Sequence, residues 1–485
     1  MNPSYRRLLI IGYGGVSQCA LPLIINFYLL KKKITSIIIV DAFDIQSKLQ
    51  PYLDQYNQIK FHQVLIDKDN FEEIFENYLS SNDIILDLGF KLDTRCELKW
   101  CNDHNVCFVN TSIELWDTLY HKHPSDPYLS TLHCRHKGLI DMLNDKTWKK
   151  NGATSIVDHG CNPGLVSHFV KRALIDMTEY ILTKCSTSIL EDKRIEFEEA
   201  LKEKNYPKLA YLIGIKTIHI SERDTQITNV PKKLNEFVNT WSVGGFVEEA
   251  LASTEIGWGT HERNIPEGML FFDEKQEPNN LVCYPRKGMD TLVRSWVPSG
   301  EIIGMVVQHS EAYGISKSLT IHKDDGNNNS IIYRPTVHFA YLPSDSAMNS
   351  LFEYRMNNYK LQPKIRLLND DIIDGAEEVG VLLLGSPYVR AWWTGSVLNI
   401  HEARRLAPGK NATTLQVAIG AVAAVNYCIN HPNEGYCLPD DIDAHEILDI
   451  CMPYLGNWIS KAVEWPPIND KITKDWQFTS FLVVD

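Results

Sequence analysis

The chain has 485 residues, a net charge of −13 and a hydrophobic content of 44%, values typical of a globular protein of roughly two to three domains. It contains no long basic block, which argues against nucleic acid or an anionic membrane surface as a partner. Eleven cysteines are too few for a disulfide scaffold, and an odd number argues against complete pairing. No signal peptide precedes the first predicted strand, so we expect a cytoplasmic protein.

The N-terminal segment has the pattern of a dinucleotide-binding unit. An apolar run at residues 8–11 predicts a strand, which ends in a glycine-rich turn that opens an amphipathic helix at residues 16–30. A second apolar run at residues 36–40 ends in an acidic residue. This order of strand, glycine turn, helix, strand and acid is that of the βαβ unit that binds a dinucleotide. The residues expected to contact the dinucleotide here are Gly12, Gly14, Gly15, Val16, Ser17 and Asp41.

Positions in this unit have separate physical roles. Gly12 allows the tight turn, Gly14 lets the backbone approach a pyrophosphate, and the helix N-terminus binds that anion. Ser17 stands where the usual pattern has a third glycine, and it is small enough for close packing of helix on strand. Asp41 can accept hydrogen bonds from a ribose hydroxyl pair and would repel a 2′-phosphate, so the unit favours NAD over NADP. The alternative is a glycine turn in an α/β core that binds no ligand.

Alternating strands and helices continue to about residue 165 and predict an α/β fold with a Rossmann-type, doubly wound parallel sheet. Strands are expected at residues 59–66, 83–88, 106–110 and 155–157, and helices at residues 70–79, 93–105 and 128–143. Ligands bind at the carboxyl ends of such strands. The residues that this rule adds to the expected cofactor site are Leu88, Gly89, Asn110, Thr111 and Asn162.

The pattern changes after a charged helical segment at residues 189–209. Strand-like segments follow at residues 213–220, 282–307 and 318–341, with a polar turn at 325–330 and no predicted helix between them. They predict a second α+β domain with a mixed or antiparallel sheet. An apolar helix at residues 412–429 is expected to return to the first domain. The predicted regions are residues 1–165, residues 166–400 and a C-terminal helical region at 401–485 that packs on the first domain.

Acidic and aromatic residues gather in the second predicted domain. Glu222 and Asp224 end a strand and could bind an ammonium group, although a solvated strand end would have the same sequence. Trp241 lies beside glycines, where tryptophan is usually a packing residue but can also present its face to a cation. Glu249 follows on the next helical turn, and Asp374 lies in a turn-like segment. This combination suits an amine substrate better than an acid.

Histidines and cysteines provide weaker signals. His309 follows a predicted strand, and a single histidine is more often structural than catalytic. Two groups of closely spaced histidines and cysteines lack a second ligand pair at zinc-like spacing: Cys101, His104 and Cys107, and His133, Cys134 and His136. We therefore expect no metal. The sequence also contains neither a nucleophile-elbow motif nor a P-loop.

Several segments together resemble one enzyme family. They read IIGYGGVSQ, FVNTSIE, DHGCNPGLVSHFVKRAL, ISERDTQ, FVNTWSVGGFVEE, GWGTHE and IDGAEEVGVLLLG. In combination they closely resemble bacterial homospermidine synthase, of the saccharopine dehydrogenase-like group, over nearly the whole chain. The motifs of the second domain indicate this family far more specifically than the glycine turn does.

The resemblance implies an activity and a cofactor. The family joins two putrescine molecules, or putrescine and a related polyamine, into homospermidine and releases ammonia. NAD is a bound hydride carrier, so an amine is oxidised to an imine, a second amine attacks, ammonia leaves and the new imine is reduced. The resemblance also implies a homodimer in which residues 166–400 carry the substrate site and the dimer contacts, whereas residues 1–165 bind NAD.

The resemblance also assigns roles to individual residues. Trp241 corresponds to a tryptophan that guides cations, His309 to a histidine near the reacting amine, and Asn162 to an asparagine beside the nicotinamide. The acidic residues of the implied substrate site are Glu114, Glu222, Glu249 and Asp374.

Two alternative functions remain open. A dehydrogenase that acts on saccharopine or carboxynorspermidine would consume its cofactor stoichiometrically and bind substrate carboxylates, usually with arginine. The acidic set of candidate residues argues against that alternative. A non-catalytic NAD-binding sensor is the other alternative.

Overall fold

The computed structural model describes residues 6–117, 126–185, 188–274, 277–323, 330–466 and 476–483. Across these residues the chain forms two compact units. The first unit comprises residues 1–124, 132–165 and 414–454, and the second comprises residues 125–131, 166–413 and 455–485. Each unit has its own sheet and its own hydrophobic core.

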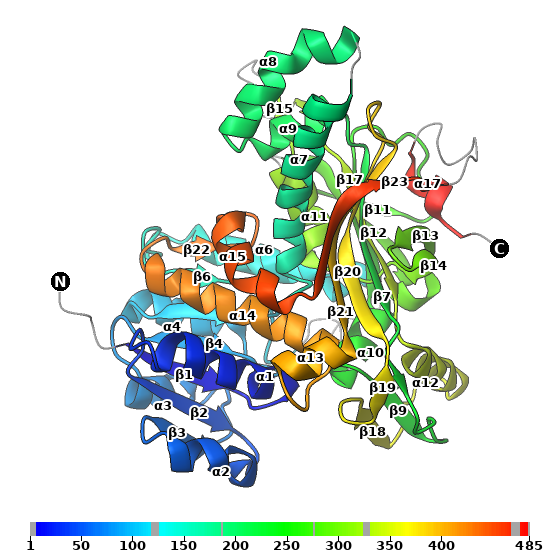
Figure 1. Ribbon diagram of the computed structural model, residues 1–485. Coiled ribbons are helices and arrows are strands. Elements are labelled where there is room, and N and C mark those ends of the chain that lie inside the picture. The colour runs from blue at the N-terminus through cyan, green and yellow to red at the C-terminus, as the bar shows by residue number, and fades with distance from the viewer. Residues whose placement is uncertain are drawn as a thin grey trace. The chain divides into compact units, whose positions relative to one another are not determined.

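The first unit is built on a parallel sheet (Figure 1). In pairing order its strands are β22 (Tyr436–Cys437), β6 (Ser155–Ile156), β5 (Cys107–Asn110), β4 (Ile84–Asp87), β1 (Arg7–Ile11), β2 (Ser36–Asp41) and β3 (Ile59–Gln63). All the pairs recorded among the described residues are parallel. The order from β3 to β6 is that of the Rossmann fold, so the predicted doubly wound sheet is confirmed.

Helices connect these strands, and four of the five lie at nearly the predicted positions. They are α1 (Gly15–Ile24), α2 (Gln46–Gln55), α3 (Phe71–Tyr78), α4 (Thr94–His104) and α6 (Leu132–Leu143). After α1 the chain continues as a π-helical turn, Ile25–Leu29. The prediction missed α2, because its polar residues and Pro51 hide the helical period and only Leu49 is buried.

The apolar helix α14 (Ala412–Asn430) belongs to the first unit from residue 414 onward. Tyr28 donates a hydrogen bond from Oη to the carbonyl oxygen of Val422 at 2.7 Å, and Figure 1 shows α14 in orange beside α1 in blue. In the part of the chain that the structure describes, α14 is the one helix long and apolar enough to cross a membrane. However, 89% of its apolar window is buried within the protein, as in the core helix of a globular unit.

The second unit is built on a mixed sheet. In pairing order its main strands are β11 (Leu270–Glu274), β12 (Glu277–Lys287), β10 (Ser253–Gly257), β17 (Thr336–Leu342), β7 (Thr217–Asp224), β20 (Ala376–Leu384), β21 (Ala391–Asn399) and β23 (Asn457–Val463). Strand β14 (Gly300–Met305) pairs with β17 and with β13 (Leu292–Val297). Only β17 and β7 run parallel among the recorded pairs of this sheet, so the predicted mixed sheet is confirmed.

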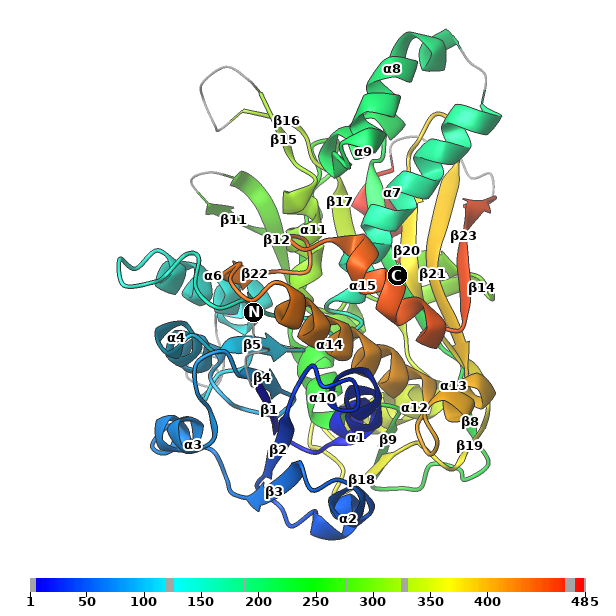
Figure 2. The ribbon, with the colours of Figure 1, turned by 60° about the vertical axis from the view of Figure 1, so that its left-hand side comes forward.

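Short strands and helices surround this sheet (Figure 2). The helices are α7 (Leu165–Lys184), α8 (Ser188–Lys202), α9 (Tyr206–Ile213), α10 (Val243–Leu251), α11 (Ser310–Ser318), α12 (Asp345–Met356), α13 (Ile400–Leu406) and α17 (Phe478–Phe481). The two-stranded pairs are β8 (Ile227–Thr228) with β19 (Ile372–Asp374), β9 (Glu236–Asn239) with β18 (Lys364–Leu367), and β15 (Ile321–His322) with β16 (Ile331–Tyr333). The prediction of no helix between the strands is wrong, because α10 and α11 interrupt them. In α11, Ser310, Glu311 and Ser316 are buried together with the apolar residues, which hides the helical period.

The C-terminal segment differs from the predicted helical region at 401–485. Residues 414–454, with α15 (Ala444–Cys451), belong to the first unit, but residues 455–485 belong to the second. There β23 pairs antiparallel with β21, and most of its residues are only partly buried. A partly solvated strand has no continuous apolar run, so the sequence did not reveal it. Residues 325–329 of the predicted polar turn lie outside the described residues.

Candidate active site

The glycine turn lies at the carboxyl edge of the parallel sheet. Gly12 has φ +79°, and a Cβ at this position would lie 2.9 Å from both the Cα of Gly89 and the carbonyl oxygen of Leu88. Only glycine fits this contact between the turns after β1 and β4. At Gly14, by contrast, no described atom outside the adjoining backbone lies within 4 Å of where a Cβ would be, and α1 begins at Gly15. The turn therefore leaves room for a phosphate at the helix N-terminus.

Asp41 and Ser17 fix the two sides of the turn. The Asp41 carboxylate accepts hydrogen bonds from the backbone N–H groups of Tyr13, at 2.6 Å, and Phe43, at 2.8 Å. Each oxygen keeps a second lone pair, which can accept from a ribose hydroxyl. The buried Ser17 hydroxyl donates to the carbonyl oxygen of Gly12 at 2.5 Å. Ser17, which replaces the third glycine of the usual pattern, thus stabilises the turn through this hydrogen bond.

The ends of β5 and β6 continue the same edge. The Asn110 amide donates from Nδ2 to the carbonyl oxygen of Ser112 at 2.7 Å, and its Oδ1 accepts from the backbone N–H of Asp158 at 2.9 Å. The first bond spans Thr111, and the second joins the end of β5 to the segment that follows β6. Glu114 accepts from the Ser112 hydroxyl at 3.5 Å, while the half-buried Asn162 precedes a cis-proline after β6. The first-unit candidates therefore follow the carboxyl ends of neighbouring strands.

A buried carboxyl pair lies behind this edge. Asp87 ends β4 and accepts from the backbone N–H of Gly89 at 2.8 Å, and Glu97 lies on α4. Burial raises the pKa of Asp87 to about 6. Burial, and then the charge of Asp87, raises the pKa of Glu97 well above its usual range. The pair therefore holds a proton at near-neutral pH.

An acidic cluster forms on one face of the sheet in the second unit. Glu222 and Asp224 are two residues apart on β7 and so point to the same face. In the strand registers, Tyr341 of β17 is the neighbour of Glu222, and Glu377 of β20 lies opposite Asp224. All four side chains are buried, with relative exposures between 1% and 6%. We refer to these four residues as the acidic cluster.

Burial and mutual repulsion disfavour negative charge in this cluster. Burial raises the pKa of Asp224 to about 6, against hydrogen bonds from Thr240 and Gln226 that lower it. Burial, followed by the charges of Asp224 and Glu222, raises the pKa of Glu377 well above its usual range. Burial and the charge of Glu222 raise the pKa of Tyr341 as well. A cationic ligand would relieve this repulsion.

Trp241 adjoins the acidic cluster. Its indole Nε1–H donates to the Tyr341 hydroxyl oxygen at 3.1 Å. Its ring meets the Phe246 ring edge-on, with centroids 5.6 Å apart and an interplanar angle of 67°. The half-buried indole therefore has a defined orientation next to carboxyl groups, an arrangement that suits a cation.

His309 and Glu249 form a second acid–base pair in the same unit. The distance from His309 Nε2 to Glu249 Oε1 is 3.4 Å, and the imidazole stacks on Phe339 with centroids 4.2 Å apart. His309 is buried at the N-cap of α11, whereas Glu249 lies on α10. The imidazole Nε2 therefore lies beside a carboxylate oxygen, a geometry that suits an acid–base pair. The structure thus brings together two candidates that are 60 positions apart in the sequence.

Asp374 is not brought to the acidic cluster. It ends β19 with a side chain that is 71% exposed, and its nearest ion partner is the equally exposed His401 at 3.7 Å. The carboxyl group of this segment that lies in the acidic cluster is Glu377, which the sequence did not indicate. Adjacent glutamates at the start of an apolar strand were the available signal. The role assigned to Asp374 stays a prediction.

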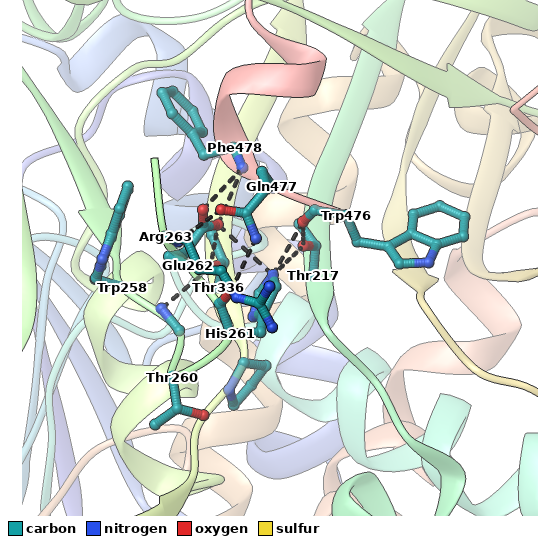
Figure 3. A network of polar contacts seen from close by, with 12 residues as sticks. Thr217, Trp258, Thr260, His261, Glu262, Arg263, Thr336, Trp476, Gln477 and Phe478 are labelled. Atoms are coloured by element: carbon teal, nitrogen blue, oxygen red, sulfur yellow. Dashed lines mark hydrogen bonds and ion pairs between the residues drawn. The ribbon is translucent and has the colours of Figure 1, made fainter. Parts of the chain in front are cut away.

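The GWGTHE motif has a structural task in the second unit (Figure 3). Glu262 accepts hydrogen bonds from the Thr336 hydroxyl at 2.7 Å and from the backbone N–H of Phe478 at 3.0 Å. Gln477 donates from Nε2 to the carbonyl oxygen of His261 at 2.8 Å. Burial raises the pKa of Glu262 to about 7. These contacts tie the C-terminal segment to the sheet.

Comparisons with known proteins cover the whole chain. Residues 8–155 match the saccharopine dehydrogenase NADP binding domain, and residues 160–463 match the saccharopine dehydrogenase C-terminal domain. The homospermidine synthase of Blastochloris viridis is 32% identical over 100% of this chain and 99% of its own length. That of Mesorhizobium japonicum is 32% identical over 98% of this chain and 96% of its own length.

A solved structure is similar in the same way. The crystal structure of homospermidine synthase from Legionella pneumophila in complex with NAD has a TM-score of 0.82 and 32% identity, and it covers 99% of this chain and 98% of its own. The agreement in sequence, length and fold leads to one assignment. The chain belongs to the homospermidine synthase family, within the saccharopine dehydrogenase group.

Proposed function

We propose that the protein is an NAD-dependent homospermidine synthase that joins two putrescine molecules, or putrescine and a related polyamine, and releases ammonia. The observation that carries the proposal is the acidic cluster beside Trp241, because buried carboxyl groups and an indole recognise ammonium groups. Enzymes that act on saccharopine would need cations for substrate carboxylates. The acidic cluster offers carboxyl groups instead, which suit an ammonium group better than a carboxylate, so that alternative is the weaker one.

The first unit fits NAD as the cofactor. The space beside Gly14 and the N-terminus of α1 accept a pyrophosphate, and Asp41 keeps lone pairs for ribose hydroxyls. The negative charge of Asp41 opposes a 2′-phosphate. NAD supplies the acceptor and donor of a hydride, so the reaction is redox-neutral overall.

The second unit would perform the proton chemistry. Hydride can leave the carbon next to nitrogen only when the amine is neutral, so a base must first take a proton from the substrate ammonium. His309 would accept that proton at Nε2, which lies 3.4 Å from Glu249 Oε1. Glu222 and Trp241 would hold a charged end of the diamine. Enclosure of the site would keep water from hydrolysing the imine before the second amine attacks it and ammonia leaves.

We also propose a cytoplasmic homodimer whose second unit carries the dimer contacts, as the family resemblance implies. All eleven cysteines lie among the described residues, and none forms a disulfide there, which is typical of a reducing compartment. Light scattering of the purified protein would test the dimer, which is expected at twice the chain mass of 55.4 kDa.

The function is tested by incubation of the purified protein with putrescine and NAD. We expect homospermidine and an equal amount of ammonia, with no net formation of NADH. Steady accumulation of NADH would instead indicate an amine dehydrogenase. Bound NAD with no product at all would indicate a non-catalytic NAD-binding protein.

A further inference from the structure

Glu377 is a buried carboxyl group for which the mechanism above has no role. In the antiparallel pair of β7 and β20 it lies directly opposite Asp224, and both side chains are almost completely buried. The Cβ atoms of opposite residues in such a pair are roughly 4.5–5.5 Å apart. Two carboxyl groups therefore face each other where water is excluded, an arrangement that is unfavourable if both are ionised.

Neutral hydrogen-bond donors contact only some of the carboxyl oxygens of Asp224 and Glu377. The Thr413 hydroxyl donates to Glu377 Oε2 at 2.5 Å, but Glu377 Oε1 has no hydrogen-bond partner among the described residues. Asp224 accepts from the Thr240 hydroxyl at 2.7 Å and from the backbone N–H of Gln226 at 2.8 Å. The Gln226 side chain donates to both Asp224 and Thr413, at 3.2 and 3.0 Å, and so joins the two carboxyl groups into one network.

The groups that face this pair are acids as well. Glu222 and Tyr341 share its face of the sheet, and Asp345 at the start of α12 adds a negative charge that acts on Asp224. Glu378 lies on the other face of β20, where the Ser299 hydroxyl and backbone N–H bind it. No lysine or arginine is recorded as an ion partner of Asp224 or Glu377 within the described ranges. The pair must therefore hold a proton or have a cation beside it.

We propose that Glu377 is a further residue of the polyamine site, where it shares one proton with Asp224 and releases it when an ammonium group binds beside Glu222. The inference rests on the proposed function and deepens it. In the step, a carboxyl O–H bond breaks, the proton passes to solvent, and the positive charge of the ligand takes its place. Glu377 is a positioning residue: it sets the negative charge that the bound ammonium group meets. Its carboxyl group is too deeply buried to contact the reacting carbon.

The experiment measures how many protons putrescine binding releases. The protein is loaded with NADH, so that putrescine cannot be oxidised, and putrescine is titrated calorimetrically at pH 7 in two buffers of different ionisation enthalpy. We expect the wild-type protein to release up to about one proton more per putrescine than Glu377→Gln, which keeps the hydrogen bond to Thr413 but cannot ionise. The same variant should bind putrescine roughly tenfold more weakly at pH 8, because a carboxylate near the ligand is lost.

The matched control is Glu378→Gln, one position along the same strand on the opposite face. Its proton release should equal that of the wild type. Equal proton release by Glu377→Gln and the wild type would overturn the inference, and the proposed function would be judged separately by homospermidine formation. If Glu377→Gln does not fold, Asp224→Asn removes the other half of the pair and should abolish the same proton.

Discussion

The two units would bind their ligands with different parts of the chain. In the first, the candidate cofactor site is made mainly of backbone, with Gly12 in a left-handed conformation and Gly14 facing open space. In the second, the candidate substrate site is made of side chains that three strands bring together, among them Glu222 and Glu377. A backbone site is damaged by an added Cβ, whereas a side-chain site is damaged by a lost charge. The two units should therefore respond to different kinds of substitution.

Each unit also buries a pair of carboxyl groups, and the comparison separates their roles. Asp87 and Glu97 are both buried in the first unit, where their side chains are hydrogen-bonded to each other. Asp224 and Glu377 lie beside Glu222 on the face that adjoins Trp241. The first pair should influence mainly stability, whereas the second should influence ligand binding.

The largest effect is expected from Gly12→Ala. The new Cβ would lie 2.9 Å from the Leu88 carbonyl oxygen, so the turn must move away from the conformation that binds a pyrophosphate. We expect NADH affinity, measured by fluorescence titration, to fall by more than about 100-fold. The control is Gly268→Ala, which has a similar φ of +85° but open space around it. Unchanged NADH affinity in Gly12→Ala would show that the turn is not the cofactor site.

A smaller effect is expected from Trp241→Leu. Loss of the aromatic face should raise the KM for putrescine roughly 3- to 30-fold, as expected for one partly desolvated cation–π contact. Trp241→Phe keeps an aromatic face but loses the hydrogen bond to Tyr341, so its KM should lie between those of the wild type and Trp241→Leu. Equal KM values for the two variants would assign Trp241 to packing alone.

The smallest effect is expected from Glu97→Gln, and it concerns stability. The raised pKa values of Asp87 and Glu97 mean that the folded state holds protons more tightly than the unfolded chain. Their stabilising contribution is therefore complete below about pH 4 and is lost as the pH rises through about 6 and above. Removal of one of the two acids should raise the Tm at pH 8 by roughly 2–4 °C and change it little at pH 4.5.

Thermal unfolding at the two pH values would measure this difference. Glu76→Gln, an exposed position of α3, provides the control and should leave the pH dependence of the Tm unchanged. A pH-independent shift in Glu97→Gln would contradict the proton-sharing pair.

Sequence reasoning succeeded where the signal is local. The turn from Gly12 to Ser17 and the strand that ends in Asp41 are recognisable because each requirement acts within one βαβ unit. Sequence reasoning failed where a strand or side chain depends on a neighbour that is distant in the sequence. Strand β23 pairs with a strand about sixty residues earlier, and Glu377 acquires its environment from Asp224, more than 150 positions away. Asp374 stood out because of its turn-like context, yet its side chain is exposed.

The sequence by itself determined the α/β class, the glycine turn and its acidic partner, and the resemblance to an enzyme family. These depend on local periodicity and on backbone freedom, which short segments encode directly. Only the tertiary structure decided which carboxyl groups lose contact with water and which of them meet. That outcome depends on strand register, because a carboxyl group becomes a buried, proton-sharing member of a site only when neighbouring strands place another acid on the same face.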